Sequence, residues 1–348
     1  MCDCLNPTFA WRIGKMRCKD GVESDRITFS EREATEYFAA RFGSEVARLM
    51  MPKFAFAVRC GKCLNCQAKK RKDWSTRLVH EASMHDRACM ITLTYDENHV
   101  PLTDDIPFTT NAEKHFWRFG QMQYALGTPT LNVRDVQLFL KRLRRQLEYH
   151  GLGGHFRYFV CGEYGKKNHR PHYHIIIFGW DDPQKVYFFQ RGSHVIYRSS
   201  IVEKCWTLGY STMTDMAPAL AKYCARYVTK KMVGNPPPDF IVPEFILQSR
   251  RGGGIGALWL QKWKYNLVHG LLTYKVGQRI IKVQTPDYYM HWLRKHDLDL
   301  WCFIRDNKID WIERHNVVNV KPVEWSDLAR KAEHYYLQLE HEKEKDET

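Results

Sequence analysis

The 348-residue chain has no hydrophobic run long enough to cross a membrane. A membrane-spanning helix needs about 20 consecutive apolar residues. The N-terminal stretch Met1–Pro7 also lacks the basic and apolar regions of a secretory signal peptide. We therefore expect a soluble, intracellular protein with no membrane partner.

Acidic residues are in the minority. The chain has 39 Asp and Glu against 53 Lys and Arg, a net charge of +14. This excess favours a polyanionic partner, with nucleic acid first and an acidic membrane surface second. A nucleotide-binding P-loop is also missing, because Gly252–Gly256 is not followed by Gly-Lys-Ser/Thr. The sequence therefore predicts no ATPase.

The eleven cysteines are odd in number, which excludes complete internal disulfide pairing. Five isolated cysteines lie in apolar segments, and we expect them to be buried thiols: Cys89, Cys161, Cys205, Cys224 and Cys302. Cys60, Cys63 and Cys66 instead have the spacing of a metal knuckle. A fourth ligand would come from Cys2, Cys4 or Cys18, and we take Cys4. We favour a structural Zn²⁺ over reactive thiols or an iron–sulfur cluster.

The order of the expected elements predicts an α+β fold, with helices flanking a central antiparallel sheet. We expect helices over 30–50, 67–87, 132–150 and 214–232, and strands over 89–95, 156–163, 171–178, 185–189 and 194–198, with 1–58 otherwise irregular. Ser30 and Glu33 have the spacing of a capping box, and Thr214 or Asp215 would cap the last helix. We expect three parts: 1–66 with the cysteine knuckle, 67–270 as the main domain, and 271–348 as an extension of unassigned role.

The most informative segment is Arg170-Pro-His-Tyr-His-Ile-Ile-Ile-Phe-Gly179. Its alternation predicts a strand with His172 and His174 on one face. Glu163 ends the preceding strand, and a short loop makes the two strands a hairpin. Its carboxylate and the two imidazoles would hold a divalent ion and leave coordination positions open for a substrate. The alternative is that both histidines are hydrogen-bonded residues of an edge strand.

Tyr223 and Tyr227 are four residues apart, which places both phenols on one face of the expected helix. Lys230 falls near that face, and a neighbouring cation lowers the pKa of a phenol. A phenolate beside a metal-polarised phosphate is suited to transesterification. The alternative is an ordinary half-buried tyrosine stripe.

Basic side chains gather in three places that are candidates for DNA phosphate contacts. They are Lys69, Lys70, Arg71 and Lys72; Arg142, Arg144 and Arg145; and Arg226 and Lys231. Interleaved aromatic residues would stack on unpaired bases: Trp74, Tyr164, Tyr173 and Trp180. The alternative is that these charge runs are solvated faces.

Taken together, the segments resemble the replication initiator proteins of microviruses, and most closely the gokushovirus branch, within the HUH endonuclease superfamily. The resemblance covers most of residues 1–270. It is carried by Cys60–Cys66, Asp73-Trp74, His80-Glu-Ala82, Thr92–Tyr95, Cys161–Gly165, Arg170–Gly179, Trp206, Gly209 and Tyr223–Lys231.

The resemblance implies a sheet like that of the palm and RNA-recognition folds. It implies that His172 and His174 bind Mg²⁺ or Mn²⁺ with Glu163 as third ligand. Tyr223 and Tyr227 would be the nucleophiles of the two-tyrosine class, assisted by Lys230. They would nick single-stranded origin DNA, leaving a 5′-phosphotyrosine and a free 3′-OH for rolling-circle synthesis, and later rejoin the circle.

The partners implied are a host helicase and polymerase, and the location is the cytoplasm of an infected bacterial cell. Two alternatives stay open. One is a zinc-knuckle protein that binds single-stranded nucleic acid without catalysis. The other is a relaxase-type HUH nickase with a different biological role.

Overall fold

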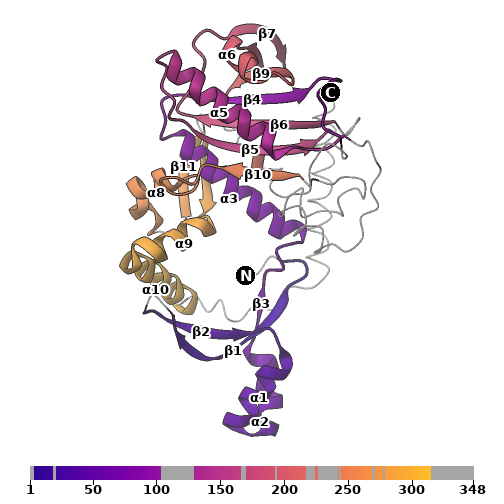
Figure 1. Ribbon diagram of the computed structural model, residues 1–348. Coiled ribbons are helices and arrows are strands. Elements are labelled where there is room, and N and C mark those ends of the chain that lie inside the picture. The colour runs from indigo at the N-terminus through magenta and orange to yellow at the C-terminus, as the bar shows by residue number, and fades with distance from the viewer. Residues whose placement is uncertain are drawn as a thin grey trace. The chain divides into compact units, whose positions relative to one another are not determined.

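The computed structural model describes residues 4–18, 21–102, 129–165, 170–192, 194–216, 224–225, 242, 244–268, 271–276 and 279–314. The chain divides into two compact units (Figure 1). The cysteine unit combines Met1–Lys69 with Leu293–Thr348, and the sheet unit is Lys70–Trp292. The three-part division at 66 and 270 stays a prediction. None of the described helices is long and apolar enough to span a membrane.

The cysteine unit contains more regular structure than its sequence suggests. Its elements are β1 (Thr8–Arg17), β2 (Glu23–Thr28), α1 (Glu31–Phe42), α2 (Ser44–Phe54), β3 (Ala55–Val58) and α10 (Leu298–Arg314). The strands form a sheet of order β2-β1-β3, so the prediction of an irregular 1–58 is wrong. The single helix expected over 30–50 is also wrong, because Gly43 divides it with φ of 84°. The Ser30 cap is confirmed: its Oγ accepts from the Glu33 amide at 3.3 Å.

The sheet unit is built on a seven-stranded sheet, which confirms the α+β prediction. The strand order is β10-β5-β6-β4-β9-β8-β7, and every neighbouring pair is antiparallel. The strands are β4 (Ala88–Tyr95), β5 (Arg157–Tyr164), β6 (Pro171–Phe178), β7 (Val186–Arg191), β8 (His194–Arg198), β9 (Gly209–Asp215) and β10 (Phe245–Gln248). The other elements are α5 (Val133–Tyr149), α6 (Ser200–Cys205), α8 (Ala257–Trp263), η2 (Lys264–Leu267), β11 (Leu271–Val276) and β12 (Arg279–Gln284). Two helices, α3 (Leu64–Ala82) and α9 (Asp287–His296), run from one unit into the other.

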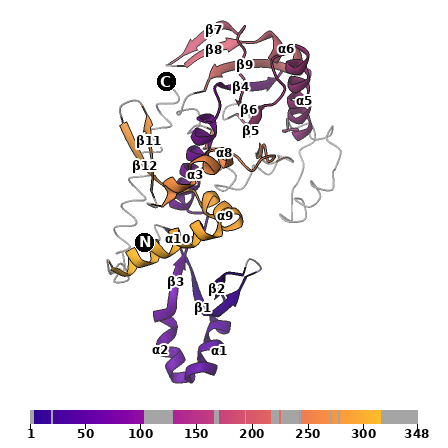
Figure 2. The same cartoon turned by 90° about the vertical axis from the view of Figure 1, so that its left-hand side faces the viewer.

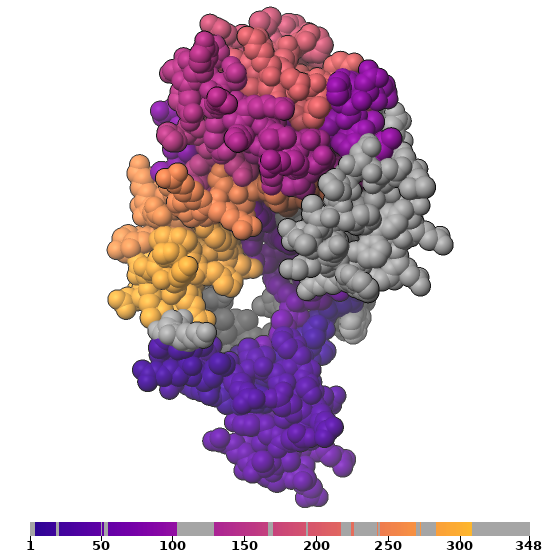
Figure 3. Space-filling view, in the orientation of Figure 1, coloured from indigo at the N-terminus to yellow at the C-terminus, as the bar shows by residue number. Residues whose placement is uncertain are grey.

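The two faces of this sheet have different coverings. The α5 face presents Tyr173, Ile175 and Ile177 to a large apolar core that includes buried residues of α5 and α6. The histidine face presents His172, His174 and Ile176, and Leu78 of α3 packs against its apolar part. Figure 1 shows α5 lying across the sheet, and Figure 3 shows the outer side of α5 (magenta) at the surface.

Local signals in the sequence account for the elements that position the site. The apolar spacing of Val136, Phe139, Leu140 and Leu143 buries one side of α5. Asn132 caps that helix by accepting from the Arg134 amide at 2.9 Å. The β5–β6 hairpin has the expected pairing, with Glu163 opposite His172.

The helix expected over 214–232 needs a correction at its start. Thr214 and Asp215 do not cap a helix but end strand β9. Thr214 Oγ1 donates to the Val195 carbonyl at 2.9 Å, which ties β9 to β8. Of the rest of this segment the structure describes Cys224 and Ala225, which are both buried.

Candidate active site

Glu163, His172 and His174 meet on the histidine face. His172 Nε2 lies 2.6 Å, and His174 Nε2 3.0 Å, from Glu163 Oε1. Glu163 and His174 are buried and His172 is half-buried. The three donor groups have ligand atoms within 4.8 Å of one another. The hairpin explains this geometry, since paired residues of adjacent strands project from the same face.

A hydrogen bond at Nδ1 orients each imidazole. His172 Nδ1 lies 3.1 Å from the Arg170 carbonyl oxygen, and because a carbonyl only accepts, Nδ1 carries the hydrogen. His174 Nδ1 lies 3.1 Å from Thr92 Oγ1. Nε2 of each ring therefore faces Glu163. Such contacts at the far nitrogen are what hold histidine ligands in place around a metal ion.

The electrostatics of the cluster call for a cation. Burial alone would raise the pKa of Glu163, but its hydrogen bonds with His172 and His174 outweigh burial and hold the pKa well below its usual range. A neutral His172 and an ionised Glu163 would both present lone pairs across 2.6 Å. That contact is stable only with a positive charge shared between them, either a proton or a metal ion. Two imidazoles and one carboxylate fit a divalent cation.

Cys224 places a second chain segment on the histidine face. Its Sγ lies 3.7 Å from Met90 Sδ, and its carbonyl oxygen lies 3.6 Å from Cys161 Sγ. Burial raises the pKa of the Cys224 thiol, and the negative charge of Glu163 adds to the effect. Tyr223, Arg226, Tyr227, Lys230 and Lys231 lie outside the described residues.

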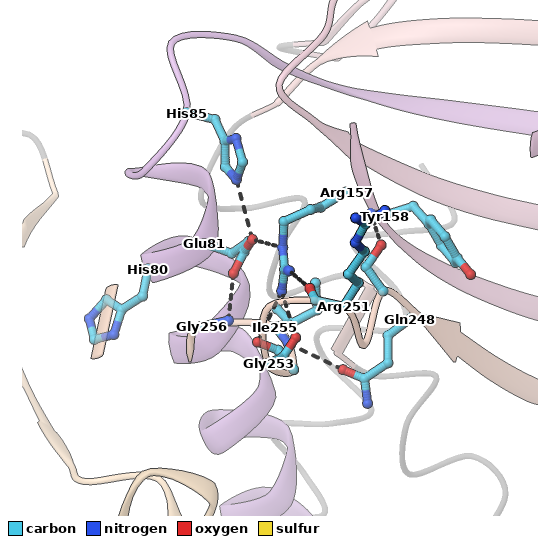
Figure 4. Close-up of polar contacts among 12 residues, drawn as sticks. His80, Glu81, His85, Arg157, Tyr158, Gln248, Arg251, Gly253, Ile255 and Gly256 are labelled. Atoms are coloured by element: carbon cyan, nitrogen blue, oxygen red, sulfur yellow. Dashed lines mark hydrogen bonds and ion pairs between the residues drawn. The ribbon is translucent and has the colours of Figure 1, made fainter. Parts of the chain in front are cut away.

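A buried ion-pair network braces the histidine face (Figure 4). Glu81 of α3 accepts from Arg157 Nε of β5 at 2.5 Å and from the Gly256 amide at 2.6 Å. His85 Nε2 lies 3.2 Å from the same carboxylate. The Arg157 guanidinium also donates to three carbonyls, those of Arg251, Gly253 and Gly254. The glycine run that lacks P-loop grammar thus serves as an acceptor loop for Arg157.

His80, next to Glu81, is also structural. Its ring stacks on Trp259 with centroids 3.8 Å apart, and its Nδ1 lies 2.9 Å from Tyr289 Oη. Burial lowers the pKa of His80 to about 4. The sequence singled out His80 and Glu81 only as part of a resemblance. Their acidic and basic residue types gave no sign of the partners, which are distant in the chain.

The cysteine unit contains a second metal-type cluster. Cys4, Cys60, Cys63 and Cys66 have sulfur atoms within 4.8 Å of one another. Backbone amides point at these sulfurs: Leu5 N lies 3.3 Å from Cys63 Sγ, and Cys63 N lies 3.2 Å from Cys60 Sγ. Burial opposes ionisation of Cys63, but the amides of Cys66 and Leu5 outweigh it and lower its pKa to about 6. Four thiols with amides directed at them fit a tetrahedral metal ion such as Zn²⁺.

The basic residues named from the sequence are not gathered at one place. Lys70 and Lys72 are exposed on α3, where Lys69 and Arg71 are half-buried. Arg142, Arg144 and Arg145 lie on α5, and therefore on the opposite side of the sheet from the histidines. Arg144 packs over the rings of Phe156 and Tyr158. Their contact with DNA stays a prediction.

Most of the aromatic residues expected to stack on bases are wrong. Tyr164, Tyr173 and Trp180 are buried in the core of the α5 face. Trp74 is half-buried between Phe159 and the Arg77 guanidinium. The buried-thiol prediction is confirmed for Cys89, Cys161, Cys205 and Cys224, whereas Cys302 is half-buried.

Comparison with known proteins gives a consistent result. A family model for replication-associated proteins of the ORF2 type matches residues 88–232. Replication-associated protein VP4 of Bdellovibrio phage phiMH2K is 30% identical over 255 residues, which are 71% of this chain and 70% of VP4. Replication-associated protein ORF4 of Chlamydia phage 1 is 31% identical over 186 residues, 52% of this chain and 40% of that protein.

Replication-associated protein ORF2 of Spiroplasma virus 4 is 29% identical over 282 residues, 79% of each chain. No solved structure matches the chain significantly. The matched region of the family model includes β4, β5 and β6, which carry the histidine face. Since the likeness to VP4 also extends over more than two thirds of both proteins, the chain belongs to the microvirus-type family of phage replication-associated proteins.

Proposed function

We propose that the protein nicks and rejoins single-stranded DNA at a phage replication origin, and so begins and ends rolling-circle synthesis. The observation that carries the proposal is the meeting of Glu163, His172 and His174 on one sheet face, in a chain from a replication-associated family. Mg²⁺ or Mn²⁺ held there would polarise the scissile phosphate through its open coordination positions.

The nucleophile in this proposal is a tyrosine hydroxyl, of Tyr223 or Tyr227. Its oxygen attacks phosphorus, the bond from phosphorus to the 3′ oxygen breaks, and a 5′-phosphotyrosine forms. The tyrosine gives up its proton, and the departing 3′ oxygen takes one up to become a free 3′-OH. Lys230 would stabilise the negative charge near the phosphate. Two tyrosines can alternate, so that the second cleaves the regenerated origin after one round.

Rejoining follows from the same chemistry. A 3′-OH attacks the phosphotyrosine, the tyrosine leaves, and a circle closes. The energy of the phosphodiester is kept in the covalent link, so this step needs no ATP, in agreement with the lack of P-loop grammar at Gly252–Gly256. Strand separation and extension are then assigned to a host helicase and polymerase, in the cytoplasm of the infected bacterium.

The position of Cys224 supports the assignment of the tyrosines. Cys224 directly follows Tyr223 in the sequence, and its side chain is buried on the histidine face near Glu163. A helix through this segment would carry Tyr223 and Tyr227 on one side, one turn apart. The segment that holds both nucleophiles is thereby tied to the face that holds the candidate metal ligands.

The cysteine cluster has a separate role in the proposal. Zn²⁺ at Cys4, Cys60, Cys63 and Cys66 would link the N-terminal strand region to the start of α3. Structural zinc sites of four cysteines are closed and stabilise small folds. The cluster therefore supports the fold of the cysteine unit and takes no part in the nicking reaction.

The test is covalent attachment of the protein to origin-bearing single-stranded DNA, measured on a denaturing gel with Mn²⁺ or with EDTA. We expect an adduct that EDTA prevents. Tyr223→Phe with Tyr227→Phe should bind DNA but form none, and Glu163→Gln should form much less. Tyr149→Phe is the matched control, since Tyr149 is 82% exposed at the end of α5. An adduct from the double Phe variant would refute the tyrosine assignment, and DNA binding without any wild-type adduct would favour a non-catalytic binder.

A further inference from the structure

A row of paired residues leads from the candidate metal site across the sheet to an exposed tyrosine. Glu163 of β5 pairs with His172 of β6, His172 with Thr94 of β4, and Thr94 with Tyr210 of β9. Paired residues of antiparallel strands share a face. Tyr210 therefore lies on the histidine face, two strands from His172, or about 10 Å at the usual strand spacing. Figure 2 shows β6, β4 and β9 as neighbouring strands.

The residues between the histidines and Tyr210 are short and polar. Thr94 fills the row itself, and the next row along the strands holds Thr92 and Thr212 beside His174. All three threonines are half-buried, and Tyr210 is 71% exposed. The histidine face is thus apolar and covered near Ile176, but low and hydroxyl-bearing between His172 and Tyr210. We call the three threonines the threonine platform.

The backbone below Tyr210 is held tightly. Gly209 has φ of 148°, and a Cβ there would lie 2.3 Å from Asp96 N and 2.4 Å from Thr94 O. Only glycine permits this approach of β9 to β4. Trp206 Nε1 donates to the same Thr94 carbonyl at 3.1 Å. Trp206 and Gly209, which the sequence marks without a role, therefore fix the strand position from which Tyr210 projects.

We propose that Tyr210 stacks on an unpaired DNA base and so guides a single strand over the threonine platform to Glu163 and the histidines. A base presents a flat face to an aromatic ring whatever its identity, so one exposed ring on a fixed strand suffices for stacking. The threonine hydroxyls can donate hydrogen bonds to phosphate oxygens. The net charge of +14 favours this polyanion over an acidic or neutral partner. The inference rests on the proposed function, because it takes the histidines as the destination of the strand.

The test is the affinity for a fluorescent oligothymidylate of about 20 nucleotides, measured by anisotropy in EDTA so that no chemistry occurs. Removal of one stacked ring by alanine substitution should weaken binding by about 5- to 100-fold. We expect this loss for Tyr210→Ala, and affinities within about threefold of wild type for Tyr210→Phe and Tyr210→Trp. Tyr187→Ala is the matched control: Tyr187 is an exposed tyrosine of the same sheet, and its pairing through Tyr197 to Met213 puts it on the α5 face.

Three results would overturn the inference: Tyr210→Ala binding as tightly as wild type, Tyr210→Phe losing as much as Tyr210→Ala, or an equal loss for duplex DNA of the same length. A second measurement is photo-crosslinking to an oligonucleotide with 5-iododeoxyuridine, in which the peptide containing Tyr210 should carry the adduct. Failure here is distinct from failure of the proposed function. Wild-type adduct formation with unaffected binding by Tyr210→Ala would refute only the stacking residue, and the reverse would refute only the nicking chemistry.

Discussion

Replacement of Glu81 should destabilise the sheet unit more than any exposed acidic substitution. Its carboxylate is fully buried and accepts from the Arg157 guanidinium and the Gly256 amide. Glu81→Ala leaves the Arg157 charge, whose side chain is 14% exposed, without its anion. Breaking a buried ion pair in this way costs about 3–5 kcal/mol. Because Arg157 keeps carbonyl partners at Arg251 and Gly253, we expect a loss near the lower limit, about 3 kcal/mol.

Glu81→Gln refines this expectation. A glutamine has one acceptor oxygen, so either Arg157 or the Gly256 amide must face an NH₂ group. The loss should be about 2 kcal/mol, smaller than for alanine. The pKa of Glu81 is lowered because His85, the Gly256 amide and Arg157 together outweigh the effect of burial. The advantage of the wild type is therefore full at neutral pH, and it decreases once the pH falls below about 4.

Urea unfolding followed by tryptophan fluorescence measures these losses as shifts of the midpoint. Glu97→Gln is the control, since Glu97 forms an ion pair with Arg170 at 2.7 Å but its side chain is 84% exposed. Such exposed pairs have little measurable effect. If Glu81→Gln lost no more stability than Glu97→Gln, the network would not be what ties α3 to β5.

Three further predictions concern the frame of the molecule. His80 has a pKa of about 4 when folded and about 6.5 when unfolded, so its contribution of about 3 kcal/mol is full above pH 6.5 and is lost as the pH falls to 4. Unfolding of His80→Gln across this range should lack that dependence. Cys63→Ser should lower the zinc content of the purified protein, measured by mass spectrometry, while Cys18→Ser, outside the cluster, should not. Asn132→Ala should lose about 1 kcal/mol in urea unfolding through the missing cap of α5, and Asn132→Asp should retain most of it.

Local patterns were sufficient to predict the core of the candidate site. Alternation of side chains along a strand put His172 and His174 on one face, and a short loop fixed the pairing that brings Glu163 opposite His172. Both signals act within the span from Glu163 to His174. The helix over 133–149 was predicted for the same reason, since its apolar spacing and its Asn132 cap are contiguous in the sequence.

Contacts between distant segments could not be predicted in this way. Thr92 orients His174 from 82 residues away, and Arg157 reaches Glu81 across 76 residues. Neither partner follows from periodicity, because the order of strands in the sheet is set by packing of the whole unit. The same limit explains the error over Tyr173. An aromatic residue beside basic residues suggests base stacking, but its burial depends on which face of β6 the α5 helix covers.

The error at Thr214 has a local cause. Threonine and aspartate before Pro218 are typical helix caps, but Gly209–Asp215 also has the alternation of a strand. The two readings compete over the same residues. Pairing decided between them, because Met213 and Thr214 lie opposite Ile91 and Met90 of β4. Local propensity is a weak guide where a segment can complete a sheet.

The division of labour between the two sheet faces explains why one strand can serve both the fold and the site. On the α5 face, Tyr173 is fully buried and its hydroxyl bonds to Tyr95 Oη and to the backbone of Asn132. These contacts hold β6 at a fixed height over α5 by packing and hydrogen bonding. His172 and His174 flank Tyr173 and project from the other face, so they inherit that rigidity while their own surroundings stay partly open. Variants on the threonine platform should therefore change DNA binding with little effect on stability, whereas variants at Tyr173 should disturb both together.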